Sequence, residues 1–491
     1  MELSGKLRTR FAPSPTGYMH IGNLRTALYT YLIARKYGGD FILRIEDTDR
    51  ERYVDGAIEK IYETLKVCGI NWDEGPDVGG EYGPYIQSER MGIYKEYAHK
   101  LVESGNAYYC FCTKERIDEM HRKQQEAKLS NMMYDRRCRD LSPEEVKENL
   151  EKGIPYVIRQ KMPTEGTTVF HDILYGDISV DNSILDDQVL LKADGMPTYN
   201  FANVIDDHLM GITHVIRGNE YLSSAPKYNL LYEAFGWKAP EYIHVEHIMR
   251  DSTHKLSKRD GDAYFGDFVE KGYLVPAIIN YIALLGWAPK GENEIFTLDE
   301  LVEEFDISGL SKSPAVFDPV KMKAINAEYI RRLSHDEFKK LAMPYIRQTV
   351  KREDAGFDVL LDALQPRTEL LTDIPEKVDF IDAVPEYSTD LYINKKMKTN
   401  AETGLEALKQ LLPVLEAADF GSLESIHSAI FAEIEKRGVK NGFMLWPLRT
   451  ALSGKALTPG GGVELCAVLG KEETLKRVKA AIELLENKQE I

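Results

Sequence analysis

The sequence has little cysteine, no long apolar run and no excess of basic residues, and each of these absences excludes a class of protein. Five cysteines among 491 residues are a low and odd number. That number argues against a disulfide framework and is typical of reduced thiols in a cytoplasm. We therefore expect a cytoplasmic protein.

The hydropathy pattern argues against a membrane protein. An apolar segment at residues 274–289 is interrupted by Asn280, and it is too short for a bilayer span of about 20 apolar residues. The N-terminal residues are polar and lead directly into an expected strand, without the pattern of a secretory leader. We expect no membrane partner.

Basic residues are outnumbered, with 62 Lys and Arg against 79 Asp and Glu and a net charge of −17. This charge argues against a generic nucleic-acid coat protein, because phosphate binding needs a basic surface. It does not exclude a nucleic-acid ligand, because only the contact face must be basic. Residues 321–353 hold nine Lys or Arg and four Asp or Glu, which fits either such a contact face or an ordinary solvated helix face. The length indicates several domains, because single cores stop growing beyond roughly 250–300 residues.

The most informative segment lies between residues 10 and 49. A short apolar run ends at Ala12, and residues 13–17 form a turn of the sequence Pro-Ser-Pro-Thr-Gly. Apolar side chains then recur at helical spacing from Leu24 to Leu32, with Asn23 as a favourable N-cap and two glycines at 38–39 as a stop. Residues 41–45 are typical of a buried strand. The pattern predicts a strand–turn–helix–strand unit with parallel strands.

The turn before this helix suits a phosphate group. A helix start offers N–H groups without partners and the positive end of the helix dipole. His20 and Asn23 carry hydrogen-bond donors, and Gly22 permits a base or ribose to approach the backbone. Taken alone, a His-x-Gly-x quartet also fits an ordinary turn with a surface histidine. The residues around it decide between the two interpretations.

Those residues resemble a known family. The run PSPTGYMHIGN, followed by RIEDTD at residues 44–49, resembles class I aminoacyl-tRNA synthetases of the glutamyl type. His20 to Asn23 resemble that class's HIGH motif, with Asn23 in place of the last histidine. The sequence KLSKR at residues 255–259 resembles its KMSKS motif, with Leu256 for methionine and Arg259 for the final serine.

The resemblance implies an α/β Rossmann-like catalytic domain with a parallel sheet, an inserted acceptor-binding domain and an all-α C-terminal anticodon-binding region. We expect the first half of the catalytic domain at residues 1–109 and the insertion at 110–188. The second half, with the KLSKR loop, is expected at residues 189–260. A helical connector that contacts the tRNA stem is expected at 261–332, and the anticodon-binding domain is expected at 333–491.

The implied reaction is the ATP-dependent ligation of L-glutamate to the 3′ end of tRNA-Glu through a glutamyl-adenylate, and glutamate activation itself would need bound tRNA. His20, Lys255 and Lys258 are the expected catalytic residues, because nucleotidyl transfer depends on positioning and on neutralising phosphate charge. Mg²⁺ is implied by ATP, and the resemblance implies a monomer as the family default. The residues expected to bind ATP are Pro13, Thr16, Gly17, His20, Gly22, Asn23, Glu220, Leu256, Ser257, Lys258 and Arg259.

Glutamate presents two carboxylates and one ammonium group, and the family's pattern implies a matching set of side chains. Arginine binds both oxygens of a carboxylate in one plane, and Arg10 and Arg217 are the candidates. Glu46 suits the ammonium group. The full set expected to bind glutamate is Arg10, Ala12, Ser14, Glu46, Tyr199, Asn203 and Arg217.

The expected insertion contains a candidate zinc site. Cys110 and Cys112 form a Cys-x-Cys pair, and Cys138 follows a polar helix. Some members of the family carry C-x-C…Y-x-x-x-C-x-H here, and this sequence keeps Tyr134 and Cys138 but has Asp140 in place of the histidine. We expect Zn²⁺ on the three thiolates, with Asp140 as the fourth ligand and Tyr134 competing for that position. The alternative is three reduced cysteines in a packed hairpin.

Other functions fit less of the chain. A small-molecule nucleotidyltransferase would not need about 150 helical residues at the C-terminus, and a paralogue that modifies an anticodon base would lack an anticodon-reading module. A tRNA-binding protein with a dead site would not need His20, Gly22, Lys255 and Lys258. A glutaminyl-type enzyme would end in β-barrels. An enzyme that also charges tRNA-Gln with glutamate remains open.

Overall fold

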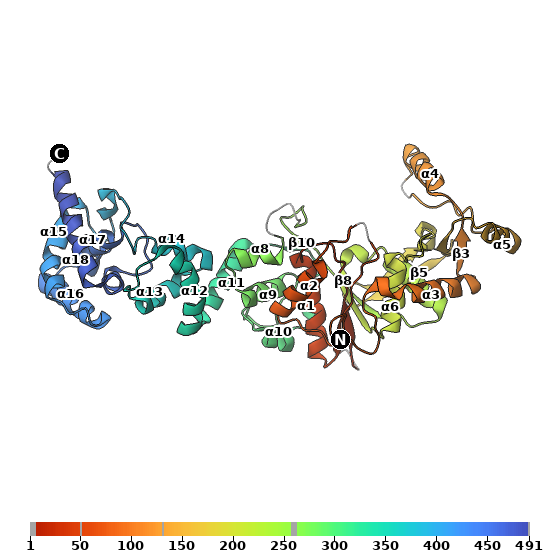
Figure 1. The fold of residues 1–491 in the computed structure, drawn as a ribbon, viewed down its shortest axis with the longest axis horizontal. Coiled ribbons are helices and arrows are strands. Elements are labelled where there is room, and N and C mark those ends of the chain that lie inside the picture. The colour runs from red at the N-terminus through yellow and green to blue at the C-terminus, as the bar shows by residue number, and fades with distance from the viewer. Residues whose placement is uncertain (1–5, 50–51, 130–131, 257–262, 490–491) are drawn as a thin grey trace. The chain divides into compact units, whose positions relative to one another are not determined.

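The computed structural model describes residues 6–49, 52–129, 132–256 and 263–489. It divides into two compact units (Figure 1), of which unit 1 comprises Met1–Asp267 with Ile279–Phe317 and unit 2 comprises Phe268–Ile278 with Asp318–Ile491. Lys258, Ser257 and Arg259, the expected ATP-binding residues of the KLSKR motif, lie outside the described residues. Among the described helices, none combines the length and the apolar character that crossing a membrane requires.

Unit 1 holds every described strand. The strands are β1 (Arg8–Phe11), β2 (Asp40–Leu43), β3 (Ala107–Cys110), β4 (Val157–Gln160), β5 (Thr167–Asp172), β6 (Gly176–Asp181), β7 (Val189–Leu191), β8 (His214–Gly218), β9 (Glu241–Val245), β10 (Ile248–Met249) and β11 (Ala315–Val316). Its helices are α1 (Ile21–Lys36), α2 (Ala57–Val67), α3 (Met91–Glu103), α4 (Lys114–Glu126), α5 (Pro143–Glu151), α6 (Tyr199–Leu209), α7 (Ala225–Phe235) and α10 (Leu298–Glu304).

The main sheet of unit 1 has six strands in the order β2-β1-β8-β9-β5-β6. The pairs β1–β2, β1–β8, β8–β9 and β9–β5 are parallel, and only the edge pair β5–β6 is antiparallel. Strands β1, β2, β8 and β9 are almost entirely buried, as expected for parallel strands covered on both faces. The prediction of a mostly parallel, Rossmann-like sheet is confirmed.

The predicted N-terminal unit is present as β1, α1 and β2, with β1 and β2 paired in parallel register from Arg8–Asp40 to Phe11–Leu43. Helix α1 ends at Lys36, and Gly38 adopts φ +61°, which glycine accommodates without a steric penalty. The strand is shorter than predicted, since it ends at Leu43 instead of residue 45. Beyond it Ile45 makes only an isolated bridge to Ile86.

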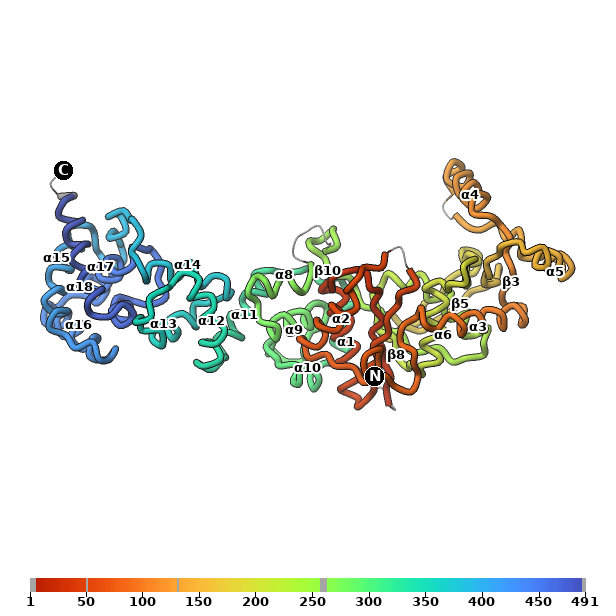
Figure 2. Tube along the Cα trace, viewed as in Figure 1, coloured from red at the N-terminus to blue at the C-terminus, as the bar shows by residue number. Residues whose placement is uncertain are grey.

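A second sheet departs from the sequence prediction. We expected the second half of the catalytic sheet to begin near Val189, but β7 pairs with β4 in a three-stranded sheet of order β3-β4-β7. The sequence predicts the residues of β5 and β6 as part of the insertion at 110–188. In the structure they form the hairpin β5–β6, which joins the six-stranded sheet through β9. Helices α4 and α5 lie beside β3 (Figure 2), and this part of unit 1 carries the predicted thiol cluster.

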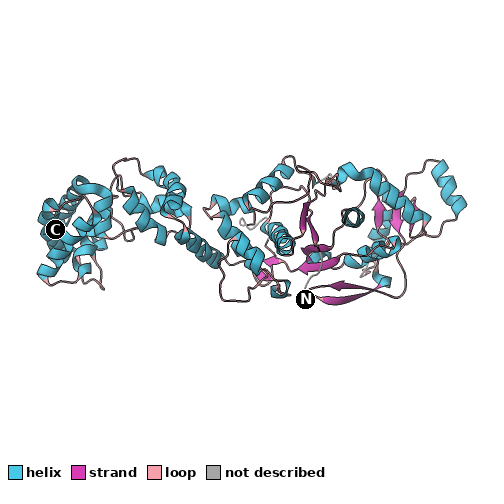
Figure 3. Ribbon diagram, turned by 90° about the horizontal axis from the view of Figure 1, so that it is seen from below, coloured by secondary structure: helices cyan, strands magenta, loops and turns pink. Residues whose placement is uncertain are grey.

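Among its described residues, unit 2 consists of helices joined by loops and has no strand, as Figure 3 shows. Its helices are α11 (Pro319–Arg332), α12 (His335–Thr349), α13 (Phe357–Leu364), α14 (Ile374–Val378), α15 (Ala401–Ala417), α16 (Leu423–Arg437), α17 (Asn441–Ser453) and α18 (Gly462–Gln489). The boundary between the units runs through α8 (Phe265–Glu270) and α9 (Val275–Leu284). Buried aliphatic side chains of α12 to α18 form one core, which confirms the predicted all-α C-terminal region.

Candidate active site

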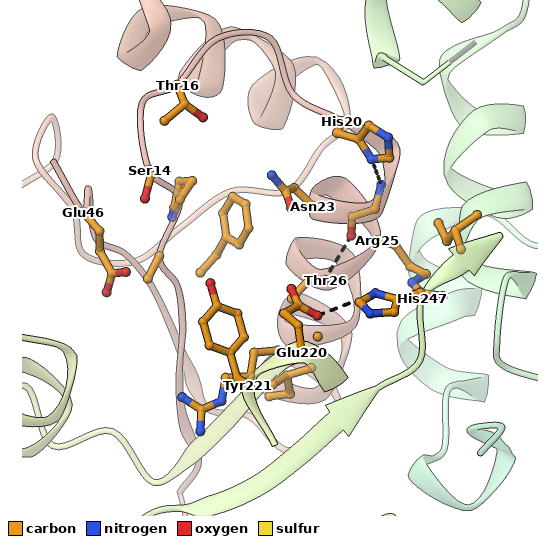
Figure 4. Close-up of a pocket in the computed structure, with 18 of the residues that line it drawn as sticks. Ser14, Thr16, His20, Asn23, Arg25, Thr26, Glu46, Glu220, Tyr221 and His247 are labelled. Carbon is orange, nitrogen blue, oxygen red and sulfur yellow. Dashed lines mark hydrogen bonds and ion pairs between the residues drawn. The ribbon is translucent and has the colours of Figure 1, made fainter. Parts of the chain in front are cut away.

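A cavity of about 300 Å³ lies at the carboxyl ends of β1 and β8 and at the start of α1. Ligands of open α/β sheets bind at this edge. Figure 4 shows Glu46 and Ser14 at one end of the cavity and His20 with His247 at the other. The predicted site residues that line it are Arg10, Ala12, Pro13, Ser14, Thr16, His20, Gly22, Asn23, Glu46, Tyr199, Arg217, Glu220, Lys255 and Leu256.

Of the described residues predicted to bind ATP or glutamate, two do not line this cavity. Gly17 lies in the turn before α1 with φ +125°, a conformation that glycine adopts most readily. Asn203 is buried in α6, where its side-chain amide donates to the Tyr199 carbonyl at 2.9 Å. The structure therefore brings together most of the predicted set and places Asn203 behind Tyr199.

The helix start is built differently from the prediction. Asn23 was expected to be the N-cap, but α1 begins at Ile21 and His20 is the N-cap residue. His20 Nδ1 accepts the Gly22 N–H at 3.0 Å, so the proton of the neutral ring resides on Nε2. A Cβ on residue 22 would approach His20 Nδ1 at 3.2 Å. A side chain at residue 22 would therefore push the His20 ring out of its place by a few tenths of an ångström.

The N–H groups of the first turn of α1 already have partners. Ile21 N–H donates to the Ala263 carbonyl at 2.9 Å, and those of Asn23 and Leu24 donate to the His20 carbonyl at 2.9 and 3.0 Å. The prediction that this turn offers unpaired N–H groups to a phosphate is wrong. What remains for an anion is the positive end of the helix dipole and the polar side chains around it.

Lys255 supplies a cation at the His20 end of the cavity. Its Nζ donates to His247 Nε2 at 2.5 Å, and His247 Nδ1 lies 3.6 Å from Glu220 Oε2. Burial lowers the pKa of His247 despite the nearby Glu220 carboxylate. A neutral His247 that accepts from Lys255 holds the lysine at the cavity without neutralising its charge.

At the opposite end of the cavity, buried charged side chains form a network of ion pairs. Arg10 Nε donates to Asp207 Oδ1 at 2.9 Å, and Arg44 Nη2 lies 2.7 Å from the same oxygen and 3.0 Å from Glu46 Oε1. Arg90 and Gln87 donate to Asp206 at 2.7 and 2.9 Å. Burial raises the pKa of Asp207, but Arg10 and Arg44 together hold it below its ordinary value. These pairs fix Arg10 and Glu46 in place before any ligand binds.

Three buried polar atoms of residues that line the cavity have no hydrogen-bond partner among the described residues, namely Arg25 Nε, Arg217 Nη2 and Glu46 Oε2. Leaving such groups unpaired is costly, so their presence indicates a ligand that completes them. Burial raises the pKa of Glu46 to about 7, against the lowering effect of Arg44. A donor and an acceptor of this kind match a carboxylate and an ammonium group.

The predicted metal residues come together in part. The Sγ atoms of Cys110, Cys112 and Cys138 all lie within 4.8 Å of one another. Tyr134 Oη lies 3.3 Å from both Cys110 Sγ and Cys112 Sγ. Asp140, the expected fourth ligand, is not a member of this group. The geometry therefore favours Tyr134 over Asp140 for the fourth position.

Comparison with known proteins identifies the family of this chain. The profile of the family described as tRNA synthetases class I (E and Q), catalytic domain, matches residues 6–324, and that of an anticodon binding domain matches residues 337–482. A glutamate–tRNA ligase of Clostridium tetani is 61% identical over 484 residues, covering 98% of both chains. This chain belongs to the glutamate–tRNA ligase family. One from Clostridium botulinum is 60% identical over 98% of this chain and 99% of its own.

Solved structures of the family have the same fold. A crystal structure of a glutamate tRNA ligase from Elizabethkingia meningosepticum in complex with its amino acid matches with a TM-score of 0.90. It is 39% identical and covers 98% of this chain and 100% of that chain. An enzyme from Elizabethkingia anophelis matches with a TM-score of 0.89 over the same shares.

Sequence reasoning missed several residues at the site of this family member. Tyr221 and His247 line the cavity, and Arg44 and Asp207 hold its ion network. Tyr221 and His247 follow strand ends, Arg44 belongs to the RIEDTD motif and Asp207 lies within α6. Arg44 and Asp207 are far apart in the chain, so no local pattern indicates their contact.

Proposed function

We propose that this chain ligates L-glutamate to the 3′ end of tRNA-Glu, using ATP and releasing pyrophosphate and AMP through a glutamyl-adenylate. The observation that carries the proposal is a donor and an acceptor that are buried in the cavity that His20 also lines and have no partner among the described residues, namely Arg217 Nη2 and Glu46 Oε2. They fit the carboxylate and the ammonium group of an amino acid. The family relationship supports glutamate as that amino acid.

The two ends of the cavity support a division of roles. Arg10, Arg217, Glu46, Ser14 and Tyr199 would hold glutamate, with Asn203 and Ala12 shaping the pocket behind them. His20 and Lys255 would bind the phosphates of ATP, which enters with Mg²⁺, and Lys258 would neutralise the leaving pyrophosphate. Activation then consists of in-line attack by glutamate on the α-phosphate, with charge stabilised by fixed donors.

The predicted domain division is part of this proposal. The insertion at residues 110–188 would contact the acceptor end of tRNA, and residues 261–332 the inner corner of the tRNA. Residues 333–491 would read the anticodon. The local excess of positive charge at residues 321–353 supports a phosphate-contacting face in an otherwise acidic chain.

Charging assays with purified tRNA-Glu and tRNA-Gln test this function. We expect glutamate-dependent charging of tRNA-Glu, and pyrophosphate exchange near background until tRNA is added. No charging of either tRNA by glutamate would overturn the proposed function. Strong exchange without tRNA would remove only the requirement for tRNA in activation.

Glu46 leads to a pH prediction. Its carboxyl must be ionised to receive the ammonium group, and burial raises its pKa to about 7 in the unliganded protein. The ionised fraction therefore falls as the pH drops below about 7. We expect kcat/KM for glutamate, which reports the free enzyme, to fall by up to about tenfold per pH unit below that value. Charging rates measured from pH 6 to pH 8 check this.

The matched control is Glu46→Gln, which has similar volume and no titrating group. Its kcat/KM for glutamate should be low and nearly independent of pH over the same range. If kcat/KM of the wild-type protein does not change between pH 8 and pH 6, the role of Glu46 is contradicted. It is also contradicted if kcat/KM of Glu46→Gln depends on pH in the same way as that of the wild type.

We propose that Cys110, Cys112 and Cys138 bind one structural Zn²⁺, with Tyr134 as the fourth ligand. Three thiol sulfurs within 4.8 Å of one another are donors of the type that Zn²⁺ takes in structural sites. A phenol oxygen at 3.3 Å from two of them lies close enough to complete the set. When bound, the metal would cross-link the end of β3 to the loop that carries Tyr134 and Cys138. It would thereby support the part of the chain expected to contact the acceptor end of tRNA.

Metal analysis of chelator-washed protein should find about one zinc per chain. Cys110→Ser should lose the metal and melt at a lower temperature, because metal binding contributes directly to folding. Cys68→Ser is the control, since Cys68 is also a buried free cysteine but lies outside the cluster. Tyr134→Phe should bind zinc more weakly, whereas Asp140→Asn should not. A metal-free protein whose melting temperature is unchanged by added zinc would contradict the site.

A further inference from the structure

Arg217 is the end of a buried chain of three side chains on neighbouring strands. Its Nε donates to His244 Nε2 at 3.0 Å, and His244 Nδ1 lies 2.7 Å from Asp172 Oδ2. Arg217 and His244 are paired residues of β8 and β9, and Asp172 ends the adjacent β5. Asp172 and His244 are fully buried and Arg217 is 5% exposed. Of these three residues, only Arg217 is predicted from the sequence to bind glutamate.

Asp172 determines which nitrogen of His244 carries the proton. Its Oδ2 also accepts the His244 backbone N–H at 3.0 Å, and its Oδ1 accepts the N–H groups of Leu174 and Tyr175, both at 2.8 Å. An ionised carboxylate can only accept hydrogen bonds, so His244 Nδ1 carries the hydrogen. Burial lowers the pKa of His244 despite the Asp172 hydrogen bond. The ring is therefore neutral, and Nε2 is an acceptor for Arg217.

A neutral partner leaves the charge of Arg217 uncompensated. Among the described residues, no carboxylate lies within ion-pair distance of its guanidinium, whereas Arg10 is paired with Asp207. The rings of Tyr228, Tyr242 and Tyr221 surround Arg217, with centroids 4.6, 5.1 and 5.4 Å from Cζ. Aromatic faces stabilise a cation without neutralising it. The Nη2 atom, also without a partner among these residues, remains for a ligand.

We propose that His244, oriented by Asp172, is a positioning residue that aims Arg217 at a carboxylate of the amino-acid substrate and keeps its charge available for it. The proposal rests on the proposed function, in that glutamate is the substrate whose carboxylate Arg217 meets. His244 does not touch glutamate itself. It holds Nε, which leaves Nη2, without a partner among the described residues, for the substrate carboxylate.

Two variants of His244 separate this role from simple packing. In His244→Gln the amide oxygen reaches the position of Nε2 and still accepts from Arg217. In His244→Asn the shorter side chain keeps a donor for Asp172 but does not reach Arg217. The KM for glutamate should rise by about 10–100-fold in His244→Asn, the usual effect of losing a hydrogen bond to a charged group. In His244→Gln it should stay within about threefold of wild type.

A double-mutant cycle with Arg217→Met tests whether His244 acts through Arg217. In the Arg217→Met background, His244→Asn should change the KM for glutamate by less than about twofold, and the KM for ATP should be unaffected throughout. These constants are measured in full-length protein by charging with glutamate and tRNA-Glu. An equal loss in the Gln and Asn variants would overturn the proposal, as would additive effects in the cycle.

The wild-type assay keeps the two hypotheses apart. If the wild-type protein does not charge tRNA with glutamate, the proposed function fails. If it does and His244→Asn has the wild-type KM for glutamate, only the role of His244 fails. Melting temperatures of the variants identify any loss that comes from the fold. If His244→Asn does not fold, His244→Gln with a raised KM for glutamate would by itself overturn the proposal.

Discussion

Replacing Arg217 with Ala is expected to raise the KM for glutamate by about 100–1000-fold, because the variant loses one partner of a buried charge pair. Arg217 is buried and lies among three tyrosine rings, and its Nη2 has no partner among the described residues. The KM for ATP should change little, since the phosphate-binding side chains lie at the other end of the cavity. Charging kinetics with glutamate and tRNA-Glu measure both constants.

Arg217→Lys is the matched control, because it keeps the charge but loses the planar fork. Its KM should lie between those of wild type and Arg217→Ala. Arg10→Ala gives a second comparison, since Arg10 is already paired with Asp207 and its loss also disturbs the ion network. If neither alanine variant discriminates less well between glutamate and glutamine, the assignment of the amino-acid pocket is wrong.

Replacing His20 with Asn should lower the rate of adenylate formation by about 100–1000-fold, the usual effect of removing one donor that stabilises transition-state charge. The KM for glutamate should change far less, because the lost contact matters most as charge develops on the phosphates. Single-turnover measurement of adenylate formation in the presence of tRNA separates these two quantities.

Asparagine is chosen because its amide oxygen occupies the place of Nδ1 and continues to cap α1 by accepting the Gly22 N–H. His20→Gln does the reverse, since it reaches toward the position of Nε2 and loses the cap, which typically stabilises a helix by about 1 kcal/mol. We therefore expect a stable but slow Asn variant and a less stable but faster Gln variant. The opposite ranking would mean that His20 acts only as a helix cap.

The predictions that succeeded rest on short-range patterns. Helical spacing from Leu24 to Leu32 and the glycines at 38–39 predicted α1, which runs from Ile21 to Lys36. The Cys-x-Cys pair and the spacing from Tyr134 to Cys138 predicted residues that the structure brings together. Turn chemistry and periodicity are local properties, so the sequence displays them directly.

Corrections arose wherever a distant partner decides the outcome. The N–H of Ile21 is taken by the Ala263 carbonyl, so an apparently vacant helix start is already satisfied. Similarly, β5 has a regular alternation of buried and exposed residues, but alternation does not specify which strand is its neighbour. One further correction has a local cause, since His20 caps α1 in place of Asn23 because its ring turns back onto Gly22.

By itself, the sequence determined the chemistry of the site, because residue types such as Arg217, Glu46 and His20 restrict what a cavity can bind. Only the tertiary structure decided how those groups are held. His244 and Asp172 are 72 residues apart and meet because β9 and β5 are adjacent strands. Such contacts follow from strand order and burial, which depend on the packing of the whole sheet. For that reason only the folded chain shows that the charge of Arg217 has a neutral partner, His244, and remains available for a ligand.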